Sequence, residues 1–142
     1  MAKKKRVTLP KDFNELLTDG NIDQLKAVYD KCELTAHDGR YSLCTPLHMG
    51  GVPDELVIWL VEKGLDINIP DYYGATPLYS QATMGRDTVK LLIELGADIE
   101  KPNTYGNTPL HVAAQFFHPK TVALLLEKGA NVNPKNDRGQ TP

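Results

Sequence analysis

The chain repeats a short signal, Thr-Pro-Leu followed by His or Tyr, at nearly regular intervals. The signal begins at Thr45, Thr76 and Thr108, and its first two residues return at Thr141. The successive spacings are 31, 32 and 33 residues. A self-similar period in this range is typical of stacked-repeat proteins, in which each unit contacts only its neighbours. Such a chain presents an extended surface rather than one deep pocket.

Each copy carries the start and stop signals of two short helices. Thr caps a helix N-terminus and Pro is tolerated at the first helical position, so Thr-Pro predicts a helix in each copy. A second apolar run ends at a glycine, which suits the left-handed residue after a helix. We therefore expect second helices over residues 55–63, 88–95 and 120–128. An Asx residue, two variable residues and a glycine then predict a tight turn in each copy.

This unit of helix, turn, helix and protruding turn resembles the ankyrin repeat. Residues 108–140 match that family's pattern most fully, with Thr-Pro-Leu-His-Val-Ala-Ala and then Leu-Leu-Leu-Glu-Lys-Gly-Ala-Asn-Val-Asn. The resemblance implies an all-α ankyrin-repeat solenoid of stacked helix-turn-helix units with protruding β-turns. We divide the chain into a basic flexible tail (1–9), an N-terminal cap (10–44), three repeats (45–75, 76–107 and 108–140) and a stub (141–142).

Four departures from the family pattern fall at defined places. The segment between the two helices is shortened in the first and second repeats, and Gly50 and Gly51 stand where small helical residues are usual. In the third repeat Phe117 occupies a position that usually holds glycine, and it is strained if that position needs a positive φ. One of Phe116 and Phe117 is expected to cover the core. Residues 40–43 form an insertion before the first repeat.

Composition excludes several kinds of partner. The formal charge is −2, and residues 7–142 carry 12 basic against 18 acidic side chains, or −6. Nucleic-acid surfaces need clustered positive charge, so we expect no nucleic-acid partner. No apolar run approaches the ~18 residues of a transmembrane helix, so we expect no membrane partner. The basic run of residues 3–6 is either a solvated terminus or an import or anionic-surface signal.

The cysteines and histidines favour structural roles. Cys32 and Cys44 are expected to be reduced thiols of an intracellular protein, with a disulfide between them as the alternative. No pair of histidines or cysteines has zinc-site spacing, and no phosphate-loop or nucleophile motif stands out, so we expect no enzyme and no cofactor. In ankyrin proteins the histidine after Thr-Pro-Leu braces neighbouring turns. The resemblance implies this role for His48 and His111, with Tyr79 in the same position of the second repeat.

The turn tips carry the strongest functional signal. In the ankyrin family the variable tip residues and the exposed side of the first helix form the usual partner-binding face, and Tyr is enriched where proteins recognise each other. By this resemblance the expected partner-binding residues are Tyr72, Tyr73, Ala75, Met84, Thr104, Tyr105, Asn107, Gln115 and Phe116. The alternative is that the tip aromatics pack only on one another. Leu60, Asp66 and Asn68 also resemble the pattern that asparagine hydroxylases accept, which makes Asn68 a candidate modification site.

We therefore expect a protein–protein interaction module that binds another protein through its concave face and turn tips. The alternative is a targeting or substrate-recruiting module of a longer enzyme or effector, with a catalytic domain after residue 142. We expect a monomer that is located in the cytoplasm rather than the nucleus. The apolar flank of the third repeat, including Val122 and Leu125, has no closing repeat, so we expect it to be partly exposed and to promote self-association. A natural chain is expected to continue past Pro142.

Overall fold

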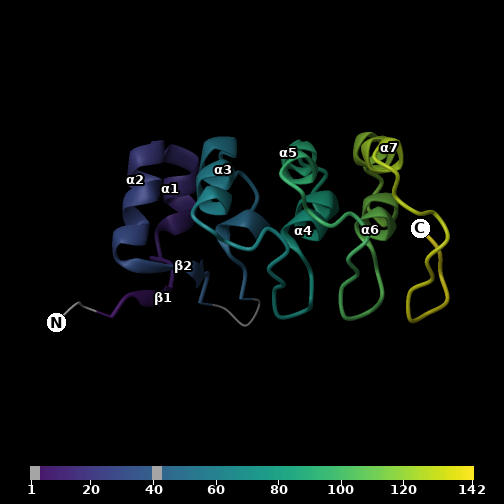
Figure 1. Cartoon of the computed structure of the whole chain (residues 1–142), viewed down its shortest axis with the longest axis horizontal. Helices are drawn as coiled ribbons and strands as arrows, with labels where there is room; N and C mark the ends of the chain where they lie inside the picture. Colours follow the sequence, from purple (N-terminus) through teal and green to yellow (C-terminus); the bar gives the residue numbers. More distant parts are fainter. Residues whose placement is uncertain (1–3, 40–42) are drawn as a thin grey trace.

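The structure, a computed structural model, describes residues 4–39 and 43–142. Its helices stand in a row, and the connecting turns project from one edge (Figure 1). In this view α3, α5 and α7 form one layer, while α4 and α6 lie nearer the turns. The elements in chain order are β1 (Arg6–Thr8), α1 (Phe13–Asp19), α2 (Ile22–Ala27), the 3-10 turn η1 (Val28–Asp30), β2 (Cys32–His37), the 3-10 turn η2 (Pro46–His48), α3 (Asp54–Glu62), α4 (Pro77–Thr83), α5 (Thr88–Glu94), α6 (Pro109–Gln115) and α7 (Pro119–Glu127).

The helix boundaries coincide with the start and stop signals in the sequence. Thr76 Oγ1 accepts a hydrogen bond from the Tyr79 amide at 3.2 Å, and Thr108 Oγ1 accepts one from the His111 amide at 3.4 Å. Each threonine thus satisfies an amide that the first turn of a helix leaves unpaired. The second helices α3, α5 and α7 begin and end within one residue of the predicted ranges. The predicted architecture of stacked helical repeats is confirmed.

The first repeat departs from this plan. Its Thr-Pro start leads only into the 3-10 turn η2, so the predicted helix at this position is wrong. The backbone becomes extended at Met49, with a ψ of 143°, and turns back through Gly51, with a φ of 80°. Glycine suits such a turn and weakens a helix interior, so Gly50 and Gly51 stop the helix almost where it starts.

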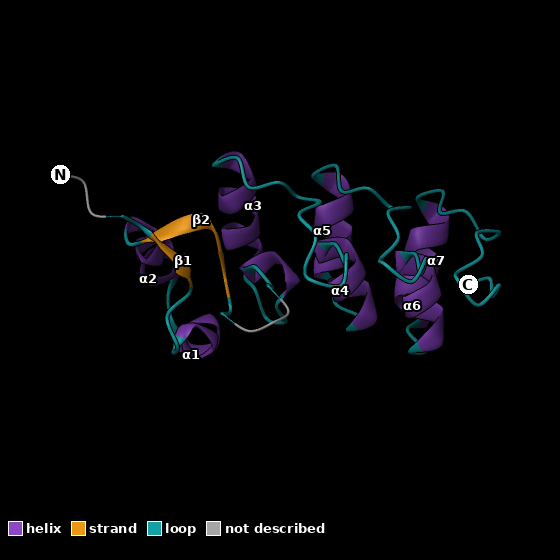
Figure 2. Cartoon of the chain, turned by 90° about the horizontal axis from the view of Figure 1, so that it is seen from below, coloured by secondary structure: helices purple, strands orange, loops and turns teal. Residues whose placement is uncertain are grey.

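A small parallel sheet joins the N-terminal segment to the cap (Figure 2). Arg6 of β1 lies opposite Cys32 of β2, and Thr8 lies opposite His37. The amide of the next residue, Leu9, donates to the His37 carbonyl at 2.8 Å, and the Leu9 side chain is buried. Backbone pairing and burial of a leucine therefore hold part of the segment that we expected to be a flexible tail. The prediction of a flexible tail does not hold from Arg6 to Leu9, and the sheet is an addition to the predicted helical fold.

Two predicted irregular segments lie partly outside the described residues. These are residues 1–3 of the tail and residues 40–42 of the insertion. At their borders the structure describes Lys5, whose Nζ donates to the Tyr29 carbonyl at 2.7 Å, and Leu43, which is exposed with a φ of 54°. The basic run is thus tied to the cap at one lysine.

One hydrophobic core runs through the cap and all three repeats. Its fully buried leucines are Leu25, Leu47, Leu56, Leu60, Leu78, Leu92 and Leu125. Leu125 was expected to be partly exposed, which is wrong: its side chain is fully buried in the core, where α6 and α7 pack against each other. Val122 is half-buried, as expected, and Leu126 and Val132 are exposed, so self-association through this flank stays a prediction. Within the described residues, no helix is both long and apolar enough to cross a membrane.

Candidate functional site

Histidine braces fix the turns against the first helices. In the first repeat the Thr45 amide donates to His48 Nδ1 at 3.2 Å, and His48 Nε2 donates to the Ala75 carbonyl at 3.1 Å. His111 repeats this geometry, since its Nε2 donates to the Gln140 carbonyl at 2.9 Å. An Nδ1 that accepts from an amide carries no proton, so His48 must be neutral with its hydrogen on Nε2. Burial lowers the pKa of His48, and its hydrogen bond to Ala75 acts in the opposite direction. The predicted bracing role is confirmed.

The turns hold their tips in fixed conformations. Asp71 Oδ1 accepts hydrogen bonds from the amides of Tyr73 and Ala75, both at 2.8 Å. Equivalent bonds are made by Asn103 in the second turn and Asn136 in the third. These are Asx turns, which lock the backbone without help from the tip side chains. The two variable side chains of each tip are therefore available for contacts outside the turn.

Adjacent tips are also bonded to one another. The Thr104 amide donates to the Tyr73 carbonyl at 3.0 Å, and the Asp137 amide donates to the Tyr105 carbonyl at 3.1 Å. Because these bonds use backbone groups, they set the spacing of the tips whatever the side chains are. The tips thus form one continuous edge, on which the tyrosines are held at fixed positions.

A hollow of about 540 Å³ lies between α4 and α6, beneath the first and second tips. We call it the α4–α6 hollow. It brings together six of the predicted binding residues that have accessible side chains: Tyr73, Met84, Tyr105, Asn107, Gln115 and Phe116. Tyr79 and Val112 add further apolar surface. The exposed fractions are 48% for Tyr73, 56% for Tyr105 and 50% for Phe116. A concave, largely aromatic surface with amides at its rim has the composition of a protein-binding site.

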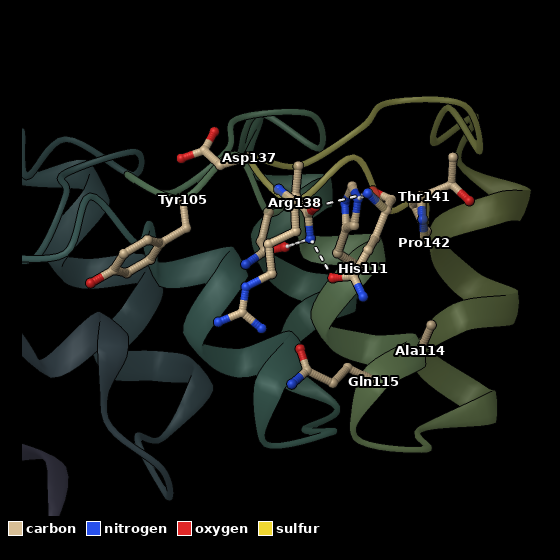
Figure 3. Close-up of a pocket in the computed structure, with 11 residues that line it drawn as sticks. Tyr105, His111, Ala114, Gln115, Asp137, Arg138, Thr141 and Pro142 are labelled. Atoms are coloured by element: carbon tan, nitrogen blue, oxygen red, sulfur yellow. Dashed lines mark hydrogen bonds between the residues drawn. The ribbon is translucent and has the colours of Figure 1, made fainter.

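A second hollow of about 540 Å³ follows along the row, between α6 and the last turn (Figure 3). We call it the α6–turn hollow. Tyr105, Asn107 and Gln115 line both hollows. The far wall of the α6–turn hollow is polar and includes Asp137 and Arg138. We did not predict these two residues, although they occupy the same variable tip positions as Tyr72 and Tyr73. Treating the variable positions of all three tips as candidate binding residues would have predicted them.

The overall geometry agrees with the comparison to known families. A family model described as ankyrin repeats (3 copies) matches residues 16–103 and residues 49–136. The chain belongs to the ankyrin-repeat family. Ankyrin repeats are generally protein–protein interaction modules and are typically non-catalytic. The comparison with curated proteins gives no match.

Three predicted residues of this ankyrin chain lie outside the hollow or are inaccessible. Ala75 is buried, and it contributes its carbonyl to His48 rather than a side chain to the surface. Tyr72 is 64% exposed but packs edge-on against Tyr73, with ring centroids 5.3 Å apart. Thr104 Oγ1 donates to the Tyr73 carbonyl at 2.9 Å. Tyr72 and Thr104 therefore contact Tyr73 from outside the hollow. Tip aromatics pack on one another in the pair Tyr72–Tyr73.

The connection from α6 to α7 is unusual for an ankyrin repeat. Phe116 is half exposed and Phe117 is 88% exposed, so the expectation that one of them covers the core is wrong. His118 makes the contact with the second repeat instead: its ring lies over Gly85, and its Nε2 donates to the Thr83 carbonyl at 2.9 Å. Phe117 has a φ of 57°, which confirms the predicted strain, and a left-handed backbone costs such a residue about 1–2 kcal/mol.

The remaining candidate residues have structural partners. Asn68 Oδ1 accepts a hydrogen bond from the Asp98 amide at 2.8 Å, which links consecutive repeats. Hydroxylation of Asn68 stays a prediction. Cys32 is buried, its Sγ donates to the Thr8 carbonyl at 3.4 Å, and burial raises the pKa of its thiol. Among the residues that the structure describes, no three His, Cys, Asp or Glu side chains are grouped to hold a metal ion.

Proposed function

We propose that this chain binds a partner protein through the α4–α6 hollow, with Tyr73, Tyr105 and Phe116 as the main contacts. The observation that carries this proposal is the collection of three half-exposed aromatic side chains around one hollow. An aromatic side chain that is half exposed still has a large apolar area to bury, and a few such residues usually dominate an interface.

The rigidity of the site supports the same proposal. Side-chain and backbone hydrogen bonds hold each tip, so little conformational freedom is lost when a partner binds. The α4–α6 hollow contains one carboxylate, Asp71, and its Oδ1 already accepts two backbone amides. The surface therefore favours an apolar or aromatic contact over a strongly charged one. A net charge of −6 over residues 7–142 argues against nucleic acid as the partner.

The test is an affinity purification followed by a binding measurement on the recovered partner. Replacing Tyr73 or Tyr105 by alanine should weaken binding at least tenfold, which corresponds to about 1.4 kcal/mol. Stability in chemical denaturation should change by less than about 0.5 kcal/mol, because both side chains are exposed.

Tyr72→Ala is the matched control, because Tyr72 is an exposed tip tyrosine that does not line the hollow. It should bind nearly as well as the wild type. Equal losses for Tyr72→Ala and Tyr73→Ala would show that the tips bind without the hollow. A large loss of stability with unchanged affinity would show that the tyrosines are structural.

A further inference from the structure

The two neighbouring hollows differ in chemistry although they share a wall. The α4–α6 hollow is dominated by aromatic and aliphatic side chains, whereas the α6–turn hollow is lined by amides, Arg138 and Asp137. Figure 3 shows the Arg138 guanidinium extending over the hollow between Tyr105 and Gln115, while the Asp137 carboxylate points away from it. A positive charge therefore faces a surface that continues directly from the apolar one.

The hydrogen-bonding groups beside Arg138 are mostly satisfied within the turn. Asn136 Nδ2 donates to Asn107 Oδ1 at 2.8 Å and to Gln140 Oε1 at 3.2 Å, so both of those acceptors are in use. Among the described residues the salt bridges are the pairs Lys26–Glu55 and Lys90–Glu94, neither of which involves Arg138. A guanidinium without an acidic partner among the described residues suits a carboxylate, which it can bind through two parallel hydrogen bonds.

We propose that the partner presents one segment that carries an apolar side chain for the α4–α6 hollow and a carboxylate for Arg138. This inference rests on the proposed function, because it extends the same surface by one repeat. Adjacent repeats are separated by roughly 10 Å, the distance between packed helices. The two side chains are then about three residues apart in an extended segment, at about 3.3 Å per residue. In a helical segment they are about seven residues apart, at about 1.5 Å per residue.

The experiment uses an array of synthetic peptides with a Ser-rich background. Each peptide carries one Leu or Phe, and one Glu placed one to eight residues before or after it. A second and a third version of every peptide replace the Glu by Gln or by Lys. The expected result is about two- to fivefold tighter binding of Glu than of Gln peptides at a separation of three or seven, the size of effect that an exposed ion pair gives. Lys peptides should bind more weakly than Gln peptides, because they repel Arg138.

Variants of the protein identify the group that reads the charge. Arg138→Gln should abolish the preference for Glu, and Arg138→Glu should invert it in favour of Lys. Lys135→Gln is the matched control, because it removes one exposed positive charge from the same turn without altering the hollow. It should keep the preference. Phe116→Ala should weaken all peptides equally, because it removes apolar surface that they share.

The outcomes separate this inference from the proposed function. An unchanged Glu preference in Arg138→Gln, or no peptide binding at all, overturns the inference. Peptides that need Phe116 but bind equally well with Glu, Gln or Lys also overturn it, and they leave the proposed function intact. If neither Phe116→Ala nor Tyr73→Ala weakens peptide binding, the result counts against both the inference and the proposed function.

Discussion

The first and third repeats begin with the same four residues and then differ. Both start Thr-Pro-Leu-His, and both use the histidine to brace the following turn. The third repeat continues into the seven-residue helix α6, whereas the first stops after the three residues of η2. The shared start therefore sets how the turn docks, and the residues after it set whether a helix forms. Those residues are Val112 and Ala113 in the third repeat, and Met49 and Gly50 in the first.

The second repeat compensates for the missing helix. Gln81, which is fully buried in α4, donates through Nε2 to the Leu47 carbonyl at 2.9 Å and to the Met49 carbonyl at 2.8 Å. A complete helix would have satisfied such carbonyls itself. The equivalent residue of the third repeat is Ala113, which packs against the complete helix α4 and needs no such donor. Gln81 thus compensates for the helix that the glycines of the first repeat interrupt.

The largest expected effect comes from removing this compensation. Gln81→Ala leaves two carbonyls without their donor and opens a gap in the core, so we expect a loss of about 3 kcal/mol in the free energy of unfolding. Urea denaturation measures it. Gln115→Ala is the control, because Gln115 is exposed on α6, and it should change stability by less than about 0.5 kcal/mol. If Gln81→Ala were as stable as Gln115→Ala, water would be satisfying the Leu47 and Met49 carbonyls in place of Gln81. The short helix of the first repeat would then need no compensation from the second.

A second prediction concerns the pH dependence of the shared histidine brace. Burial lowers the pKa of His48 below its ordinary value of about 6.5, which His48 regains in the unfolded chain. Below pH ~6.5 the unfolded chain therefore binds a proton that the folded chain does not. The stability contributed by His48 is present above this pH and is lost as the pH falls, by up to about 1.4 kcal/mol per pH unit.

Urea denaturation between pH 7.5 and 5 measures this loss. His48→Gln keeps a polar side chain without a titrating ring, so its stability should fall less steeply with pH than that of the wild type. Parallel curves for the two proteins would mean that the His48 pKa is the same in the folded and unfolded chains. Protonated His48 would then be compatible with the fold of the first repeat.

The periodic parts of the molecule were predictable because local signals agree with the fold. Thr-Pro starts, Gly stops and Asx turns located α3, α5 and α7, the histidine braces and the tips with Tyr73 and Tyr105. Each of these features is set by a few adjacent residues. The residues that line the α4–α6 hollow were predicted by placing equivalent positions of neighbouring repeats side by side, but the hollow itself was not predicted.

The unpredicted features depend on contacts between distant residues. The pairing of β1 with β2 joins segments about 26 residues apart, from Arg6 to Cys32, and a three-residue strand leaves almost no pattern. The carbonyls that the interrupted first helix leaves unpaired are satisfied by Gln81, which lies in the next repeat. The burial of Leu125 likewise depends on packing that its local sequence does not reveal. Arg138 was missed because only the aromatic tips were read as binding residues.

The smallest predicted effect tests the residue with positive φ before the second helix of each repeat. Each repeat has one residue with positive φ there: Gly51 at 80°, Gly85 at 62° and Phe117 at 57°. Only Phe117 has a side chain that makes this backbone unfavourable, and at 88% exposure it gains little from packing. Phe117→Gly should therefore raise the free energy of unfolding by about 1 kcal/mol, after allowing for the greater freedom of glycine in the unfolded chain.

Chemical denaturation of Phe117→Gly beside Phe116→Gly decides whether that strain is real. Phe116 has an ordinary negative φ of −95°, so glycine relieves nothing at that position and should lower stability. A gain at 117 with a loss at 116 shows that the third repeat tolerates strain which the first two avoid with glycine. If Phe117→Gly were neutral or destabilising, its exposed ring would be contributing contacts that offset the strain, and the three connections would be energetically alike.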